Sequence, residues 1–410
     1  TPQVSISLDG IKQGKLEDFN FNIINTNYEN ILLNIEISDI LKKIENTYKV
    51  KASIYPDINL LEEENTLLWD IDYKRIFNNE FNTSPIIDLN VKVDAKTGYL
   101  LDVEKTNISS FIDSGQVLDH SNPKYILYKK SETFDDNIKE TLWIYNTNSE
   151  EKEKLYISSL PICSAKINSN NSFIYILEKD ENNSILYLLD TKDNKSYKVM
   201  LKDNMFVNSV AWKDDNTLLL IENVDGITNI YEFNIHTNDL TYSKSFNYPI
   251  NSIRIKNDKY LFTYSNKKTL ESLIHIYDLN SDSDYKLNGI KPKFLNTNKI
   301  GYIHTHENKD SSEFLIFNLD DYTVYDKVEL NISNFTPVDE NTLILLEKNN
   351  VESSYTVYIY DIENKSYEKI QKSTTDNIWF NKSNELLYMN LRFPDAKDDS
   401  SLILYLKDVN

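Results

Sequence analysis

The stretch over residues 206–244 reads FVNSVAWKDDNTLLLIENVDGITNIYEFNIHTNDLTYSK. It contains four short apolar runs, FVNSVAW, TLLLIEN, ITNIYEFNI and LTYSK, and polar residues that favour turns separate them. Short apolar runs bounded by Asn, Asp, Gly and Ser are typical of β-strands joined by tight turns. The stretch therefore predicts four consecutive short strands.

The same four-part unit returns before and after this stretch, with a period near 42 residues. Its first strand begins at positions 163, 208, 251, 291, 333 and 376, in steps of 45, 43, 40, 42 and 43 residues. Its third strand occurs seven times, as LWIYNTN, ILYLLDTKDNK, NIYEFNIHTN, LIHIYDLNSD, FLIFNLDDY, VYIYDIENKS and LILYLKDVN. Four-stranded repeats of this length are typical of the blades of a β-propeller.

We therefore predict a mainly β fold, with a seven-bladed β-propeller over residues 106–410 and a small α+β domain over residues 1–105. Six or eight blades remain alternatives if the first blade is assigned wrongly. The last repeat has no fourth strand, and an open edge would leave backbone groups unpaired. We expect residues 99–106 to close the ring by pairing with residues 402–406. Residues 111–115 would then be the inner strand of the first blade.

The N-terminal part carries its own signature. Ile40, Leu41, Ile44 and Tyr48 have helical spacing, and alternating strands follow. The sequence VDAKTGYLL at residues 93–101 resembles the closing signature of PepSY domains, and the resemblance extends over residues 38–103. It implies an exported bacterial protein that regulates a peptidase or binds at the cell surface, and it carries over no catalytic residue.

The repeated part resembles WD40-like and TolB-like β-propellers in architecture. The Gly-His and Trp-Asp pairs of WD40 repeats and the Ser-x-Asp-x-Gly boxes of sialidases do not occur in the repeats. The resemblance therefore implies a fold and not a function.

Composition excludes several classes of partner. Acidic side chains number 64 and basic ones 44, which gives a formal net charge of −20. Nucleic acid and anionic membrane surfaces are disfavoured, because both require clustered Lys and Arg. The sequence contains no run of 18 apolar residues, so it predicts no transmembrane helix. The single cysteine, Cys163, cannot form an internal disulfide, and we expect it to be a small buried residue.

The chain starts at Thr1 without Met, and its first residues have the composition of a polar tether. We expect an extracytoplasmic protein, secreted or anchored by a lipid upstream of Thr1, and a cytoplasmic protein is the alternative. We expect a monomer without a cofactor.

Five polar residues hold equivalent positions in the predicted inner strands and would surround the channel: Asn208, Asn251, Lys291, Ser333 and Asp376. Such a ring can bind a ligand through convergent hydrogen bonds. A water-filled channel without a ligand is the alternative. We predict a non-enzymatic binding or scaffold protein that recognises a protein, a peptide or a cell-envelope glycan at the propeller mouth.

A propeller hydrolase or lyase acting on polysaccharide or peptide is the alternative function. Asp113 and Asp376 fall in adjoining predicted blades and could act as paired carboxylates. Hydrogen bonds from backbone amides to these carboxylates are the simpler interpretation.

A second candidate site is the H-x-H of His304 and His306. On one strand both imidazoles would face the same side, where they could hold zinc or another divalent cation. Two strand-end histidines on a polar face are the simpler interpretation. His120, His236 and His275 follow no such pattern, and we expect them at the surface or in hairpins.

Overall fold

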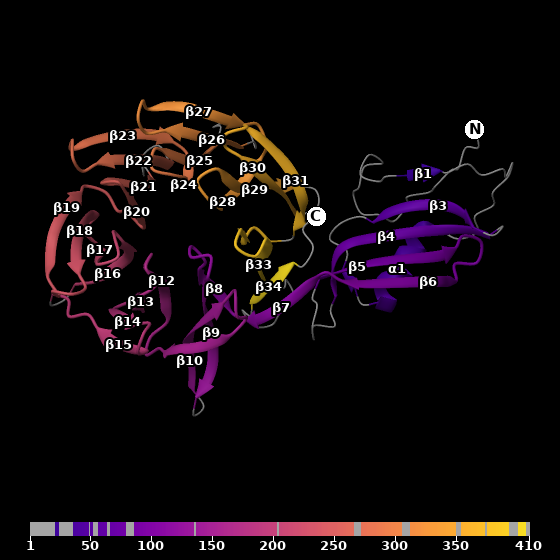
Figure 1. Cartoon of the computed structure of the whole chain (residues 1–410), viewed down its shortest axis with the longest axis horizontal. Helices are drawn as coiled ribbons and strands as arrows, with labels where there is room; N and C mark the ends of the chain where they lie inside the picture. The colour runs from indigo at the N-terminus through magenta and orange to yellow at the C-terminus, as the bar shows by residue number, and fades with distance from the viewer. Residues whose placement is uncertain are drawn as a thin grey trace.

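Seven four-stranded sheets stand around a common axis, and a separate six-stranded sheet lies beside the ring (Figure 1). The computed structural model describes residues 21–23, 36–48, 50–51, 56–63, 66–78, 86–134, 137–202, 205–265, 272–305, 312–349, 354–373, 375–392 and 401–406. The predicted fold class is confirmed: the protein is mainly β, with a seven-bladed propeller and a small N-terminal α+β domain. The one helix among the described residues, α1 (Ile37–Tyr48), is not long or apolar enough to span a membrane.

The N-terminal sheet has the strand order β1-β3-β4-β5-β6, and β2 pairs with β4. Its strands are β1 (Phe21–Ile23), β2 (Val50–Lys51), β3 (Asp57–Glu63), β4 (Thr66–Asn78), β5 (Ile86–Asp94) and β6 (Leu100–Asn107). In β5 the apolar residues Leu89, Val91 and Val93 alternate with polar ones, so they lie on one face of the sheet. Ile40 and Ile44 of α1 belong to the same buried cluster.

Each blade consists of four antiparallel strands. The first contains β8 (Gln116–Asp119), β9 (Tyr125–Phe134), β10 (Asn137–Asn146) and β11 (Lys152–Ile157). The second contains β12 (Ile162–Ile167), β13 (Phe173–Lys179), β14 (Ser184–Asp190) and β15 (Lys195–Lys198). The third contains β16 (Val207–Trp212), β17 (Thr217–Val224), β18 (Ile227–Asn234) and β19 (Leu240–Phe246).

The remaining blades repeat this order. The fourth contains β20 (Ile253–Lys256), β21 (Lys259–Ser265), β22 (Ser272–Asp278) and β23 (Ser283–Asn288). The fifth contains β24 (Ile290–Phe294), β25 (Lys299–Thr305), β26 (Ser312–Asn318) and β27 (Thr323–Val328). The sixth contains β28 (Ile332–Pro337), β29 (Thr342–Asn349), β30 (Ser354–Asp361) and β31 (Ser366–Ser373). The seventh contains β32 (Ile378–Asn381), β33 (Leu386–Arg392), β34 (Ser401–Leu406) and β7 (Ser109–Ser114).

The ring closes through β7, which comes from the N-terminal side of the chain and pairs antiparallel with β34 (Figure 1). A borrowed closing strand was predicted correctly, but its assignment to residues 99–106 is wrong. Those residues form most of β6, which pairs with β5. The inner strand of the first blade is β8, so its assignment to residues 111–115 is wrong as well. The closing strand must supply an apolar side chain to the core between the last and first blades, and Ile112 of β7 does so.

One buried residue, Ile108, separates β6 from β7. The backbone amide of Ile86, at the start of β5, donates to Ser109 Oγ at 2.9 Å, and Ser109 Oγ donates to Ile86 O at 3.2 Å. Ile86 and Ile108 also pack in the cluster that contains Leu404 and Leu406 of β34. The N-terminal sheet and the closing strand are therefore joined by a shared core.

Two crossings between blades consist of a single glycine. Gly115 links β7 to β8 with φ 152°, and Gly289 links β23 to β24 with φ 156°. A Cβ on Gly115 would lie 2.7 Å from Lys129 O and 2.9 Å from the Tyr128 ring. Only a residue without a side chain allows the backbone to approach this closely.

Neighbouring blades pack through shared apolar clusters. One cluster combines Leu177 and Leu186 of the second blade with Val210 and Phe233 of the third. Cys163, which we expected to be buried, is exposed. The register of β12 against β13 shifts between Ile162 and Ser164, and this bulge turns Cys163 outward.

Candidate functional site

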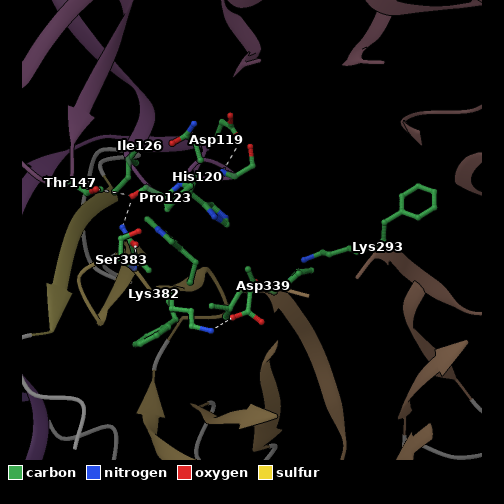
Figure 2. A pocket seen from close by; sticks show the side chains of 18 of the residues that line it. Asp119, His120, Pro123, Ile126, Thr147, Lys293, Asp339, Lys382 and Ser383 are labelled. Carbon is green, nitrogen blue, oxygen red and sulfur yellow. Dashed lines mark hydrogen bonds and ion pairs between the residues drawn. The ribbon is translucent and has the colours of Figure 1, made fainter. Parts of the chain in front are cut away.

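A cavity of about 690 Å³ opens at one mouth of the channel. Because each of the seven blades places its first strand at the channel, the ends of these inner strands gather at this mouth. The ends of β8, β28 and β32 and the turns after them supply most of the wall, and Lys166 and Arg254 reach it from β12 and β20. Figure 2 shows Lys293 entering the cavity opposite Asp119 and His120.

Strand register brings one set of side chains to the same level of the channel. In every blade one inner-strand residue pairs with the third residue of the second strand. We call these residues the channel ring; in blade order they are Asp119, Lys166, Ala211, Arg254, Lys293, Thr336 and Trp379. All except Ala211 line the cavity. The ring thus contains three basic residues in a strongly acidic protein.

These three cations lack carboxylate partners. Within the described part of the chain, the side chains of Lys166 and Arg254 form no hydrogen bond or ion pair. The Lys293 ammonium donates to Phe335 O and lies 4.9 Å from the centroid of the Phe335 ring. The Asp119 carboxylate instead accepts backbone N–H groups, from Ser121 at 3.0 Å and from Ile167 at 3.3 Å.

The surroundings of the cavity lower the pKa of Lys293, Arg254 and His120. Burial, with the nearby charges of Arg254 and Lys291, lowers the pKa of Lys293 to about 7. Burial also lowers the pKa of Arg254, whose side chain is open to water yet surrounded by the channel wall. Burial lowers the pKa of His120 to about 4; Asp119 opposes this shift, and Lys293 contributes to it. His120 is therefore a neutral imidazole near pH 7.

An aromatic stack forms one wall of the cavity. The Trp379 ring lies on the His120 ring, with centroids 4.5 Å apart and planes at 13°. The Trp379 ring also stacks on the Tyr388 ring, with centroids 5.8 Å apart. Trp379 is only 4% exposed, so the stack is a rigid part of the wall between the first and seventh blades.

Contacts between blades stabilise the rim, which is the opening of the cavity. Asp339 of the sixth blade forms an ion pair with Lys382 of the seventh (Figure 2). Asn381 Nδ2 donates to Pro123 O of the first blade at 2.6 Å. These contacts join the last two blades to the first around the opening.

The five residues that we predicted at the channel mouth lie at the other ends of the inner strands. Asn208, Lys291 and Ser333 are the second residues of β16, β24 and β28, whereas Asn251 and Asp376 come two residues before β20 and β32. Lys291 Nζ donates to Ser333 O at 2.8 Å, so these two residues are brought together. None of the five lines the cavity described above. A binding role for them stays a prediction.

The predicted carboxylate pair does not assemble. Asp113 lies in β7, the outermost strand of the seventh blade, and Asp376 precedes β32, the innermost strand of that blade. The Asp113 carboxylate accepts the Tyr128 hydroxyl at 2.8 Å and pairs with Lys130 at 2.5 Å. Asp113 therefore stabilises the seam between the last and first blades.

The predicted metal pair is only partly described. His304 lies in β25, and its Nδ1 is 3.0 Å from Asn288 O, whereas His306 falls outside the described residues. In the described part of the chain, no three His, Cys, Asp or Glu side chains gather as a metal site requires. A metal site at His304 and His306 stays a prediction.

The remaining histidines correct one expectation. His236 is exposed in a hairpin, as expected, but His275 is fully buried, with Nδ1 3.1 Å from Asp284 Oδ1. His120 follows β8 and lines the cavity. The sequence reasoning missed it because residues 111–115 had taken the place of β8 as the inner strand. Aligning residues 116–119 with the other inner strands would have found it.

No protein-family model matches the chain, and a search of curated proteins finds no match. Among solved structures, an oligogalacturonate lyase in complex with manganese is 9% identical, with a TM-score of 0.56 over 78% of this chain and 96% of that one. The β-propeller domain of the Trilobed protease from Pyrococcus furiosus is 14% identical, with a TM-score of 0.52 over 73% and 98% of the two chains. TolB from Acinetobacter baumannii is 13% identical, with a TM-score of 0.41 over 78% and 81%.

The fold is thus similar to that of known β-propellers, as the repeats predicted. At these identities the likeness concerns the fold alone. No family model supports the PepSY resemblance of residues 38–103, which stays a prediction.

Proposed function

We propose that this protein is a non-enzymatic binding protein that holds a peptide segment of a partner protein in the cavity at the channel mouth. The observation that carries the proposal is the cavity itself, with unpaired cations at the level of the channel ring and apolar side chains beside them. Phe294, Pro337 and Val338 line it together with Lys166 and Arg254. A concave site with apolar walls and a few convergent polar groups is the usual form of a ligand site.

A peptide fits this lining better than a glycan of the cell envelope does. A sugar ring usually packs its C–H face on an exposed aromatic ring, and the indole of Trp379 is only 4% exposed. A peptide can pack an apolar side chain on one wall and direct polar groups at another. The lyase or hydrolase alternative depended on Asp113 and Asp376 acting as a pair. Asp113 instead contacts Tyr128 and Lys130 at the seam between blades, so this pair does not support the alternative.

Two further parts of the proposal concern the whole chain. We take residues 1–105 and 106–410 as its two domains, and we place the protein outside the cytoplasm. Cell fractionation with an antibody against the propeller tests this location; recovery with cytoplasmic markers would contradict it.

A displayed peptide library tests the proposed function. Peptides enriched on the wild-type protein should bind at least tenfold more weakly to Thr336→Trp, which places an indole in the cavity. Thr241→Trp is the matched control, because Thr241 is exposed on the outer strand β19 and does not line the cavity. Equal binding to Thr336→Trp and the wild type would contradict the proposal, provided circular dichroism shows both variants folded.

A further inference from the structure

Among the described residues, no carboxylate pairs with the three cations of the channel ring, Lys166, Arg254 and Lys293, although the chain has 20 more acidic than basic side chains. Elsewhere the half-buried lysines of the propeller pair readily, as Lys213 does with Glu232 at 2.9 Å. Keeping a cation out of bulk water without a counter-charge costs free energy. Lys166 and Lys293 are half-buried, Arg254 is open to the cavity, and like charges at one level repel one another, so the arrangement indicates that a ligand brings the missing charge.

The neighbouring acids do not neutralise this level of the channel. Both oxygens of Asp119 accept backbone amides, which reduces its effect on the ring cations. At the rim Asp339 is paired with Lys382. Glu340 lines the cavity beside this pair, so negative charge lies at the rim and positive charge lies deeper, at the channel ring.

We propose that the channel ring binds a carboxylate of the ligand through Arg254, Lys166 and Lys293. This inference rests on the proposed function, since it assigns the group that a bound peptide presents to the ring. The planar guanidinium of Arg254 can donate two parallel hydrogen bonds to one carboxylate, and the two ammonium groups add charge-assisted donors. The cavity is lined by four basic side chains (Lys166, Arg254, Lys293 and Lys382) and three acidic ones (Asp119, Asp339 and Glu340), and this excess of one positive charge matches a monoanion better than a dianionic phosphate.

The wall beside the ring selects the rest of the ligand. Phe294, Pro337 and Val338 line the same cavity, so an apolar side chain can pack there while its carboxylate meets the cations. A peptide supplies this combination in two ways: at a C-terminal apolar residue, or at an Asp or Glu beside an apolar residue.

Lysine footprinting of the full chain tests the inference with three small probes. N-acetyl-phenylalanine carries a terminal carboxylate, N-acetyl-aspartyl-phenylalaninamide carries a side-chain carboxylate, and N-acetyl-phenylalaninamide carries none. Acetylation of Lys293 and Lys166 is read by mass spectrometry, with the exposed Lys195 as internal reference. A carboxylate probe should slow acetylation of Lys293 at least threefold at a concentration where the neutral amide has no effect. Whichever carboxylate probe protects identifies the source of the anion.

Arg254→Gln should abolish this protection, whereas Lys198→Gln at an exposed position of the outer strand β15 should leave it intact and keeps Lys195 as the reference. Equal protection by the neutral amide, stronger protection by inorganic phosphate, or unchanged protection in Arg254→Gln would overturn the inference. So would the absence of protection by either carboxylate. In these cases the proposed function still stands if library peptides bind the wild type and not Thr336→Trp. Loss of that difference would remove the proposed function itself.

Discussion

The indole of Trp379 in the last blade stacks on the imidazole of His120 in the first blade, with ring centroids 4.5 Å apart. The two residues come from opposite ends of the propeller sequence and meet only because β7 closes the ring. Both also line the cavity. Closure of the ring and formation of the candidate site are therefore one structural event.

The stack predicts an unusual titration of His120. Burial holds its pKa at about 4, so Trp379→Ala, which opens the wall to water, should raise this pKa toward 6.5. NMR titration of the five histidines measures the change, and Trp143→Ala in the first blade is the control. Because the folded-state pKa lies below that of the unfolded chain, His120 should make the wild type lose stability as pH falls from 6.5 to 4. A His120 pKa near 6.5 in the wild type would contradict this account.

Lys293 should give a pH dependence of the same sign as His120, at higher pH. Its pKa of about 7 in the folded protein lies below the 10.5 of an ordinary lysine, so the unfolded chain binds more protons between these values. The contribution of Lys293 to the free energy of unfolding should therefore rise from about pH 7 to 10.5. The difference in the free energy of unfolding between wild type and Lys293→Met, measured with urea across this pH range, gives this contribution. Parallel pH profiles would show that Lys293 titrates normally.

The same titration bears on ligand binding. A carboxylate ligand should bind more weakly as pH rises through 7, because Lys293 loses its charge while Arg254 keeps its own. In Lys293→Met, binding should be weaker and should not change around pH 7.

Asp113 should matter for stability and Asp376 should not. Asp113→Asn leaves Lys130 without its counter-charge at the seam and should lower the free energy of unfolding by about 1–3 kcal/mol. The Asp376 carboxylate has no hydrogen bond or ion pair within the described residues, so Asp376→Asn should change stability by less than about 0.5 kcal/mol. Denaturant melts of both variants make the comparison, and equal losses would argue against the seam.

Gly115→Ala should also destabilise the ring. The added Cβ would meet Lys129 O at 2.7 Å, and the backbone at Gly115 has φ 152°. Gly226→Ala is the matched control, because Gly226 also has a positive φ, of 83°, but has no atom within 4 Å of the added Cβ. We expect a loss of more than about 1 kcal/mol beyond that of the control, by urea denaturation. Equal losses would mean that the crossing tolerates a side chain.

The propeller could be predicted from the sequence because seven imperfect repeats share the same pattern of strands and turns. No single copy is specific, but regular turns and alternating strands at one period leave few other folds. The error at the closure arose because β6 and β7 are both alternating strands separated only by Ile108. Only the pairing of each strand shows which of the two closes the ring, and the sequence pattern of a strand does not indicate the strand with which it pairs.

The channel ring could not be predicted for a related reason. Bulges shift the register between Val207 and Ser209 and between Ile290 and Lys293. A shift of one residue turns every following side chain to the other face of a strand. Aligning the first residues of the inner strands therefore pointed to Asn208 and Lys291, whereas hydrogen-bond register aligns Ala211 with Lys293.

A designed disulfide between β7 and β34 tests ring closure, on which the site depends, most directly. Ser110 pairs with Tyr405 across the two strands. In a Cys163→Ser background, Ser110→Cys with Tyr405→Cys should form a disulfide under mild oxidation, because paired residues on neighbouring strands bring their Cβ atoms within reach. The control places the first cysteine at Val103, which pairs with Val91 in the N-terminal sheet. Peptide mapping that shows a bond from position 110 and none from position 103 is the predicted result; a bond from position 103 alone would contradict the closed ring and the site built on it.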